Sequence, residues 1–443
     1  MYSKDQKTRL DFGKEEVMEQ KRVNRRDFLR GAAMVAGATA LAACSTPGEQ
    51  PGSGQPAGGD QVTIVQYYHQ YGEEGTQQAA KKYADSYSEV NSKVKVDMQW
   101  IPGDYEQKLN AALLTEQAPD VFEHGPNAAY VNAGQVVALD DLFPDDIKKD
   151  FDPKVIERNS WKGKIYSVQM IVDTGALYCR KSVLDAAGVK PPQTLDELID
   201  AATKLSDNKT KGLFLGNDGI GGSGDMSIYA GGGALVDQNK VVFNTDRAAE
   251  GLMKIKALNE ANVLLIGAPT DWWDPGSLTS GLAAMQWCGL WAMPGIRKAI
   301  NDDFYVTAFP KLDDQGSPAT FLGGWSEFVN AKGKHIDESK AFTKWLWIDN
   351  TDAQKDWSLS YGFHVPPRMS AAASADPLKS GAAKEVMDIV NQYGKDAGPY
   401  MTNNMWTSFN NAVANIIKNG ADPKTELDAA AQACQTELDK VLA

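Results

Sequence analysis

The sequence predicts an α/β fold, and three observations support this prediction. From Val62 onward, short apolar runs typical of buried strands alternate with segments whose apolar residues recur at helical spacing. The chain has 443 residues, enough for two or three domains that each bury a core. Its residues are 42% hydrophobic and 23% charged, a composition that excludes a disordered chain and a polytopic membrane protein.

The first elements of the globular part alternate between strand and helix. Strands are predicted over 62–68, 94–100 and 118–123, with a helix over 74–87 between the first two. Asp104 and Gln107 have the spacing of a capping box, so we expect a helix to begin there and to present Leu109 and Leu113 on one face.

The clearest helix is predicted over 194–205. Thr194 is placed as its N-cap and Glu197 as its third helical residue, and apolar residues then follow at helical spacing. Further helices are predicted over 245–261, 337–349, 351–360, 383–393, 404–418 and 423–441, and strands over 164–170, 284–288, 304–308 and 326–330.

The N-terminus resembles an export signal. In residues 1–43, Arg25 and Arg26 precede a run of thirteen small or apolar residues, too short to cross a bilayer, and the pair resembles a twin-arginine signal. The sequence LAAC ending at Cys44 resembles a lipoprotein processing box, which predicts lipidation of Cys44. Residues 44–60 are rich in Gly, Pro and Ser and predict a flexible tether. We therefore expect an extracytoplasmic protein anchored to the cell membrane.

The net charge bears on the class of partner, and the cysteines bear on metal binding and disulfide formation. The net charge of −13 opposes binding to nucleic acid, because a phosphate backbone would be repelled. With Cys44 lipidated, Cys179, Cys288 and Cys434 remain, widely spaced and without the spacing of metal ligands. One pair of them could form a disulfide, and the sequence does not choose which.

Motifs of enzymes and of cofactor sites give no support to catalysis. Residues 219–224 (GIGGSG) have the spacing of a dinucleotide-binding turn, but the segment MSIYAGGG that follows does not predict the long helix this motif needs, so a flexible loop is expected. The paired carboxylates at 140–141 and 145–146 are interpreted as a solvated, helix-capping surface rather than a glycosidase pair. The four histidines have no metal-like spacing, so neither a metal nor a cofactor is expected.

Tryptophans are the informative residues of this chain. Eight of the eleven lie between 272 and 357. Trp345, Trp347 and Trp357 lie in predicted helices, where packing in a core is favoured. Trp272, Trp273, Trp291 and Trp325 lie beside glycines and prolines, where no helix face buries them. A flat apolar ring beside hydrogen-bonding groups suits a sugar, which has an apolar face and many hydroxyls.

Several segments, taken in order, resemble the solute-binding proteins of bacterial sugar ABC importers, of the maltose-binding-protein type. They include YYHQYGEEGTQQA, IVDTGALYCRKSVLDAAGVKPPQTLDEL, GLAAMQWCGLWAM, GGWSEFVNAKGKHIDESKAFTKWLW and YGFHVPPR, and they run from about 62 to 440. The resemblance implies a two-lobed periplasmic-binding-protein fold in which the chain crosses three times between the lobes. The implied lobes are 60–173 with 322–368, and 174–321 with 369–443. A central ligand cleft would close as the two lobes approach, and a membrane permease would recognise the closed form.

The resemblance also implies which residues contact the ligand. It places Tyr68, His69 and Gln70 after the first strand, Glu123 and Asp173 as acceptors for sugar hydroxyls, Trp291 as a stacking ring, Gly323, Gly324 and Trp325 against the ligand, and Arg368 and Trp406 nearby. Asp225, Trp272 and Trp273 are added from their local sequence. A purely structural role stays open for four of these residues. His69 could be a hydrogen-bonded loop histidine, Glu123 a helix cap, Asp173 a hydrogen-bonding residue of the hinge, and Arg368 part of a surface ion pair.

The predicted function is therefore a monomeric lipoprotein that binds a mono- or oligosaccharide without chemistry and delivers it to an ABC permease. Two alternatives remain at this stage. One is a secreted polysaccharide-active hydrolase or lyase, which would also use tryptophans and carboxylates in a cleft. The other keeps the two-lobed receptor and gives it a non-sugar ligand. The sequence names neither the sugar nor its length and linkage.

Overall fold

The computed structural model describes residues 61–443. The predicted export signal, the predicted tether and the predicted lipidation site at Cys44 lie outside these residues. Among the residues described, no helix is both long and apolar enough to span a membrane.

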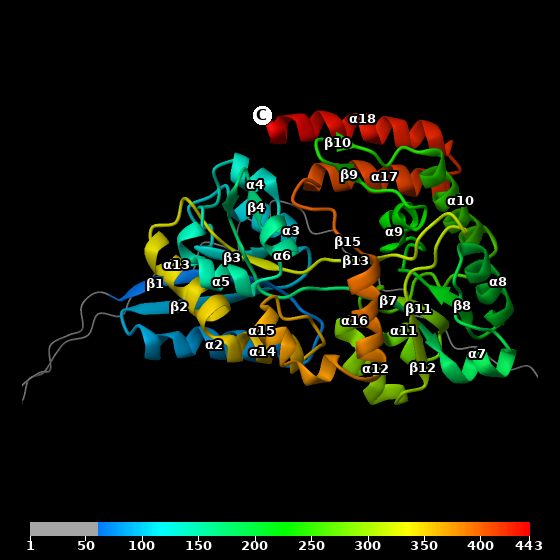
Figure 1. The fold of residues 1–443 in the computed structure, drawn as a ribbon, viewed down its shortest axis with the longest axis horizontal. Helices are drawn as coiled ribbons and strands as arrows, with labels where there is room; N and C mark the ends of the chain where they lie inside the picture. The colour runs from blue at the N-terminus through cyan, green and yellow to red at the C-terminus, as the bar shows by residue number, and fades with distance from the viewer. Residues whose placement is uncertain (1–60) are drawn as a thin grey trace, which may run out of the picture. The chain divides into compact units, whose positions relative to one another are not determined.

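The described chain is built around two separate β-sheets (Figure 1). The strands of the first sheet, in spatial order, are β2 (Val94–Ile101), β1 (Val62–His69), β3 (Val121–His124), β14 (Ser326–Val329) and β6 (Val168–Gln169). Those of the second are β12 (Phe304–Thr307), β7 (Gly175–Arg180), β11 (Ala283–Gly289) and β8 (Lys211–Phe214). Each sheet mixes parallel and antiparallel neighbours. In the first sheet, β1 is parallel to β2 and β3, whereas β14 is antiparallel to β3. In the second sheet, β7 is antiparallel to β11 and β12, whereas β11 is parallel to β8. The α/β prediction is confirmed.

Each sheet has its own covering helices, and the two assemblies form the two lobes of the fold (Figure 1). The first lobe contains α2 (Thr76–Val90), α3 (Tyr105–Ala112), α4 (Ala128–Asn132), α5 (Asp145–Asp150), α6 (Pro153–Arg158), α13 (Ile336–Lys344) and α14 (Thr351–Leu359). The second contains α7 (Lys181–Ala187), α8 (Leu195–Leu205), α9 (Ser223–Ala230), α10 (Asp246–Glu260), α11 (Gly276–Thr279), α12 (Met293–Ile300), α16 (Gly381–Tyr393), α17 (Asn403–Asn419) and α18 (Pro423–Leu442). The short helix α15 (Met369–Ala373) follows α14 and contacts it.

The chain passes between the two sheets more than once. The first passage lies between β6 and β7, and the second between β13 (Thr320–Phe321) and β14. A later segment returns past the first passage, where Val172 and Val365 form an isolated bridge. β15 (Gly394–Lys395) then pairs with β13. The lobe boundaries expected from the sequence stay a prediction.

The predicted helices and strands match the structure closely where local signals are strong. The N-cap of α8 is formed as expected: Thr194 Oγ1 accepts from the Glu197 backbone N–H at 3.2 Å, and Glu197 Oε2 accepts from the Gln193 N–H at 2.7 Å. Asp104 likewise caps α3 through the Gln107 N–H at 3.0 Å. The short helices α4 to α6 were not predicted, since each has six residues or fewer and shows little periodicity.

Two local expectations are wrong. Residues 219–224 were expected to lie in a flexible loop, but Ser223 and Gly224 begin α9, where seven of eight residues are buried. Tertiary burial stabilises this helix, which local propensity alone does not predict. The helix expected over 337–349 is α-helical only to Lys344 and continues as a π-helical turn over Trp345–Asp349.

The tryptophans assigned to a core are buried as expected. Trp347 is 0% exposed and Trp357 is 1% exposed, both in the core of the first lobe, and the partly buried Trp345 packs against the same cluster. Cys179, Cys288 and Cys434 are all buried and free, so no disulfide joins any two of these three thiols.

Candidate functional site

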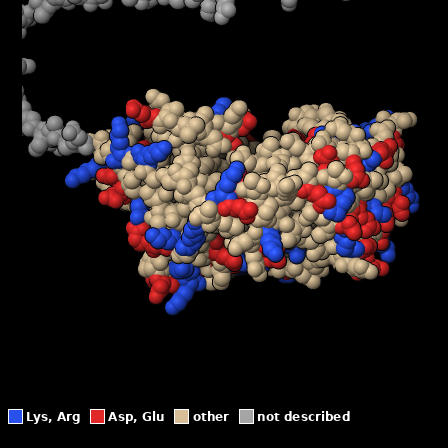
Figure 2. All heavy atoms as spheres, turned by 90° about the horizontal axis from the view of Figure 1, so that it is seen from above, with Lys and Arg blue, Asp and Glu red and all other residues tan. Residues whose placement is uncertain are grey.

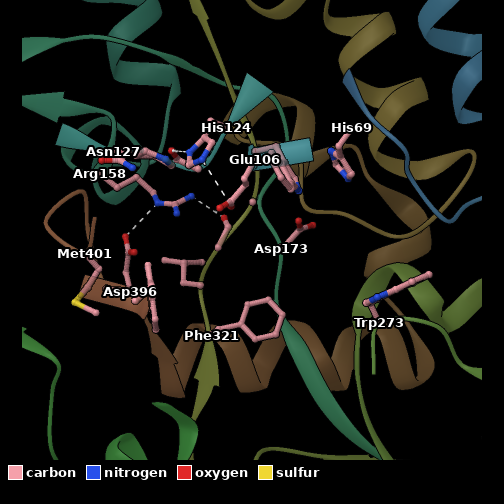
Figure 3. Close-up of a pocket in the computed structure, with 18 of the residues that line it drawn as sticks. His69, Glu106, His124, Asn127, Arg158, Asp173, Trp273, Phe321, Asp396 and Met401 are labelled. Carbon is pink, nitrogen blue, oxygen red and sulfur yellow. Dashed lines mark hydrogen bonds and ion pairs between the residues drawn. The ribbon is translucent and has the colours of Figure 1, made fainter. Parts of the chain in front are cut away.

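A cavity of about 650 Å³ is lined by residues of both lobes (Figure 3). This volume falls in the range of small-molecule sites. Eleven of the residues expected at the site line it: His69, Gln70, Asp173, Asp225, Trp272, Trp273, Trp291, Gly323, Gly324, Trp325 and Trp406. These residues come from segments far apart in the sequence, and the fold brings them to one place.

Aromatic rings form two groups on the cavity wall. In the first lobe, Trp325 stacks on His69 with ring centroids 4.1 Å apart, and His69 packs on Tyr71 at 3.9 Å. In the second lobe, Trp272 and Trp291 meet edge to face at 5.9 Å, and Trp291 Nε1 donates to the Trp273 carbonyl at 2.9 Å. The hydrogen bond of its indole N–H fixes the orientation of Trp291, and stacking on His69 fixes that of Trp325. Both rings are therefore pre-oriented to face a ligand.

The structure places Tyr68, Glu123 and Arg368 outside the cavity lining, contrary to the direct ligand contact expected for them. Tyr68 is 1% exposed and packs in the core against Trp357. It lies on β1 one residue before His69, and successive side chains of a strand point to opposite faces.

Glu123 acts behind the cavity wall. Its carboxylate accepts from the His69 backbone N–H at 2.6 Å and from the Tyr71 hydroxyl at 2.7 Å, and it lies 2.5 Å from His69 Nδ1. It therefore orients two residues of the wall rather than meeting a ligand. Arg368 pairs with Asp150 at 2.7 Å and donates to the Ile348 carbonyl, so it ties the start of α15 to the first lobe.

His364 links two carboxylates of the cavity wall. Its Nδ1 lies 2.5 Å from Asp173 Oδ1 and its Nε2 lies 3.4 Å from Glu73 Oε1. Burial alone would lower the pKa of His364, but the charges and hydrogen bonds of Asp173 and Glu73 outweigh burial and raise this pKa to about 10. At neutral pH the ring is thus an imidazolium held between two carboxylates, and the ring of Trp291 lies nearly parallel to it at 6.3 Å.

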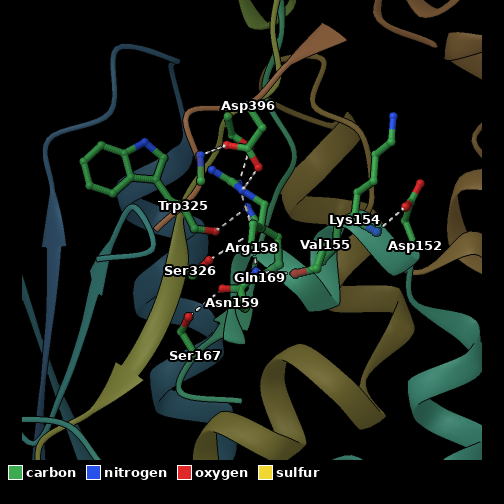
Figure 4. Close-up of polar contacts among 12 residues, drawn as sticks. Asp152, Lys154, Val155, Arg158, Asn159, Ser167, Gln169, Trp325, Ser326 and Asp396 are labelled. Carbon is green, nitrogen blue, oxygen red and sulfur yellow. Dashed lines mark hydrogen bonds and ion pairs between the residues drawn. The ribbon is translucent and has the colours of Figure 1, made fainter. Parts of the chain in front are cut away.

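Arg158 is the centre of a second polar cluster (Figure 4). Its Nη1 donates to Gln169 Oε1 at 3.0 Å and to the Gly323 carbonyl at 2.7 Å, and its Nε lies 3.2 Å from Asp396 Oδ2. Arg158 belongs to α6 of the first lobe, whereas Asp396 follows β15, so this ion pair joins segments on the two sides of the cavity.

Two further titratable groups of the wall have shifted pKa values. Burial lowers the pKa of His124 from its usual value, although Glu106 opposes that shift. Burial raises the pKa of Asp225, in the first turn of α9, to about 6. Shifted pKa values of this kind are common among the residues of functional sites.

Sequence reasoning missed several residues that line the cavity: Glu73, Glu106, His124, Asn127, Arg158, Tyr229, Phe321, His364 and Asp396. One signal was available for His124, the last residue of a short buried strand, because ligands bind at the carboxyl ends of parallel strands. Arg158 and Asp396 gave no such signal, since only the tertiary fold brings them together. Among residues 61–443, no three His, Cys, Asp or Glu side chains gather closely enough to hold a metal ion.

A sequence profile of bacterial extracellular solute-binding proteins matches residues 78–386 of this chain. The maltotriose-binding protein of Pyrococcus abyssi is 25% identical over 383 residues, covering 82% of this chain and 79% of that protein. The diacetylchitobiose-binding protein of Streptomyces coelicolor is 28% identical over 314 residues, covering 68% of this chain and 72% of that protein.

The fold is similar to that of a solved receptor. The GacH receptor of Streptomyces glaucescens, which was solved both unliganded and with acarbose, superposes with a TM-score of 0.73 at 24% identity. The match covers 86% of this chain and 99% of the receptor, so the two chains share the whole two-lobed architecture.

Proposed function

Because the chain belongs to the bacterial extracellular solute-binding protein family, we propose that it captures a mono- or oligosaccharide in the cavity and delivers it to the permease of an ABC importer. In this proposal the ligand leaves chemically unchanged. The protein is a binding component, not an enzyme, and it acts outside the cytoplasm.

The observation that carries the proposal is the lining of the cavity. Half-buried indoles of Trp272, Trp291, Trp325 and Trp406 lie beside the carboxylates of Asp173 and Asp225. A saccharide needs this combination, since its ring offers C–H groups to an aromatic face and its hydroxyls need charged or polar partners at the edge. Two relatives are named for binding maltotriose and diacetylchitobiose, which supports a saccharide ligand here.

The anchoring and the lobes are part of the same proposal. We infer that Cys44 carries a lipid and that 44–60 is the tether, so the globular part stays close to the permease. The proposed lobes are 60–173 with 322–368, and 174–321 with 369–443. Their closure over the ligand would present a surface that the permease recognises. The protein would act as a monomer.

A calorimetric sugar panel tests the proposal. We expect at least one monosaccharide or oligosaccharide to bind with 1:1 stoichiometry and to raise the thermal unfolding midpoint. If no carbohydrate of a broad panel binds, the ligand class is wrong. The same mixtures, incubated and then separated by chromatography, distinguish a receptor from an enzyme: new products would contradict the proposed function.

A further inference from the structure

His124 lines the cavity and has a ring nitrogen that the protein leaves without a hydrogen-bond partner. It is 5% exposed, ends β3 and lies edge to face with Tyr130 and Trp325, at 5.1 Å and 6.4 Å between ring centroids. Its Nδ1 lies 2.7 Å from the Gly125 carbonyl oxygen. Because a carbonyl oxygen only accepts, Nδ1 carries the proton and donates it.

The other ring nitrogen is therefore a lone-pair acceptor. Burial lowers the pKa of His124, so its ring is neutral and Nε2 is unprotonated. This Nε2 is buried and has no hydrogen-bond partner among the residues that the structure describes. A buried acceptor without a donor costs free energy, so the site favours a ligand that supplies one.

Glu106 of α3 lies opposite this nitrogen (Figure 3). Its Oε1 is 3.7 Å from His124 Nε2, beyond hydrogen-bond distance. A carboxylate oxygen also only accepts, so two acceptors face each other with no donor between them. One small donor group can reach both atoms.

The charges of the wall add a second constraint on the ligand. Five carboxylates line the cavity: Glu73, Glu106, Asp173, Asp225 and Asp396. The cations that line it are Arg158, Lys395 and the imidazolium of His364, so five negative charges meet three positive ones. Arg158 and His364 are already bound to carboxylates of the wall. The cavity as a whole therefore favours a ligand with positive charge.

We propose that the cavity recognises a saccharide that carries a protonated amine, with its ammonium group donating to both His124 Nε2 and Glu106 Oε1. This inference rests on the proposed saccharide function. An ammonium group has three N–H donors and no acceptor, so it satisfies both atoms and offsets the charge of Glu106. A hydroxyl has a single hydrogen and satisfies only one of them. The nearby ring of Trp325 adds an aromatic face, which attracts cations.

Matched pairs of sugars test the inference by calorimetry at pH 7. Each pair has the same stereochemistry with and without the amine: glucosamine and glucose, galactosamine and galactose, mannosamine and mannose, and the β-1,4 glucosamine disaccharide and cellobiose. We expect the amine to bind at least tenfold more tightly in any pair that binds. Equal or weaker binding of the amine would overturn the inference and leave the saccharide function intact.

Variants separate this contact from general binding. Glu106→Gln keeps the size of a half-exposed side chain and removes its charge, so the preference for the amine should fall at least fivefold. Glu116→Gln removes the same charge from an exposed position outside the cavity lining and should keep the preference. An unchanged preference in Glu106→Gln would contradict the inference. If no member of any pair binds but the wider panel yields a neutral sugar ligand, the amine inference is wrong and the saccharide function stands. If no sugar of either panel binds, the inference and the proposed function are both wrong.

Discussion

Trp291 lies in the wall of the cavity, with its ring N–H held by the Trp273 carbonyl. A pre-oriented ring loses little entropy when a ligand stacks on it, which is why such residues dominate binding energies. Replacement by alanine removes the stacking face and leaves the rest of the wall in place.

We expect Trp291→Ala to weaken sugar binding by about 2 kcal/mol or more, roughly 30-fold in Kd. Calorimetry with the sugar identified by the panel measures this change. Trp345→Phe, at a partly buried tryptophan of the first lobe that does not line the cavity, is the matched control and should keep the affinity. An unchanged Kd for Trp291→Ala would remove this residue from the binding site.

His364 makes the stability of the protein depend on pH. Its pKa is about 10 in the folded protein against about 6.5 in an unfolded chain, so folding favours its protonated form. The stabilisation is therefore complete below about pH 6.5 and is lost as the pH rises toward 10.

We expect the difference in the free energy of unfolding between the wild type and His364→Gln to shrink from pH 6.5 to pH 10. Urea titrations across this range measure it. His335→Gln, a histidine outside the cavity, is the control and should show no such trend. A pH-independent difference would show that His364 is neutral in the fold.

At the residue scale, the sequence pointed to residues that line the cavity where a side chain lies close to a strand end or a glycine-rich loop, as for His69, Asp173 and Trp325. Their contact with a ligand stays a prediction. Prediction from the sequence failed for Glu123, because the polar residue of β3 that reaches the cavity is the next one, His124. It could not reach Arg158 or His364, since their partners lie 238 and 191 residues away in the chain. Contacts of that kind exist only after the two lobes have formed.

At the scale of elements, capped and periodic segments were predicted well. The helices α8, α10, α17 and α18 each begin at a side chain that accepts a hydrogen bond from the first turn. The sequence predicted the cap of α8 and the presence of the other three helices. It did not predict the π-helical turn at Trp345–Asp349, because burial of Leu346, Trp347 and Ile348 in the core sets its geometry.

The cap of α8 offers a test at this scale. We expect Thr194→Ala to lower the free energy of unfolding by about 1 kcal/mol, because the Glu197 N–H loses its acceptor. Thr203→Ala lies in the same helix, is exposed and is no cap, so it should change stability by less than about 0.5 kcal/mol. Equal effects of the two substitutions in urea unfolding would mean that the cap contributes nothing specific.

At the scale of the whole molecule, the cavity lies between two assemblies that each have their own sheet and core. The basic and acidic side chains are interspersed over the face shown in Figure 2, so that face offers no uniform charge to a partner. Ligand contacts on both lobes would stabilise a closed arrangement relative to an open one.

We expect the bound sugar to reduce the radius of gyration measured by small-angle X-ray scattering. The Trp291→Ala variant at the same sugar concentration is the control, since it should stay closer to the free state. A radius that does not change when the wild type is saturated would mean that binding does not move the lobes.

The three buried thiols have one more consequence. Cys179, Cys288 and Cys434 are unpaired, and burial raises the pKa of each, which keeps them as unreactive thiols. The globular part described here therefore needs no oxidant to mature. Dithiothreitol should therefore leave its melting temperature unchanged.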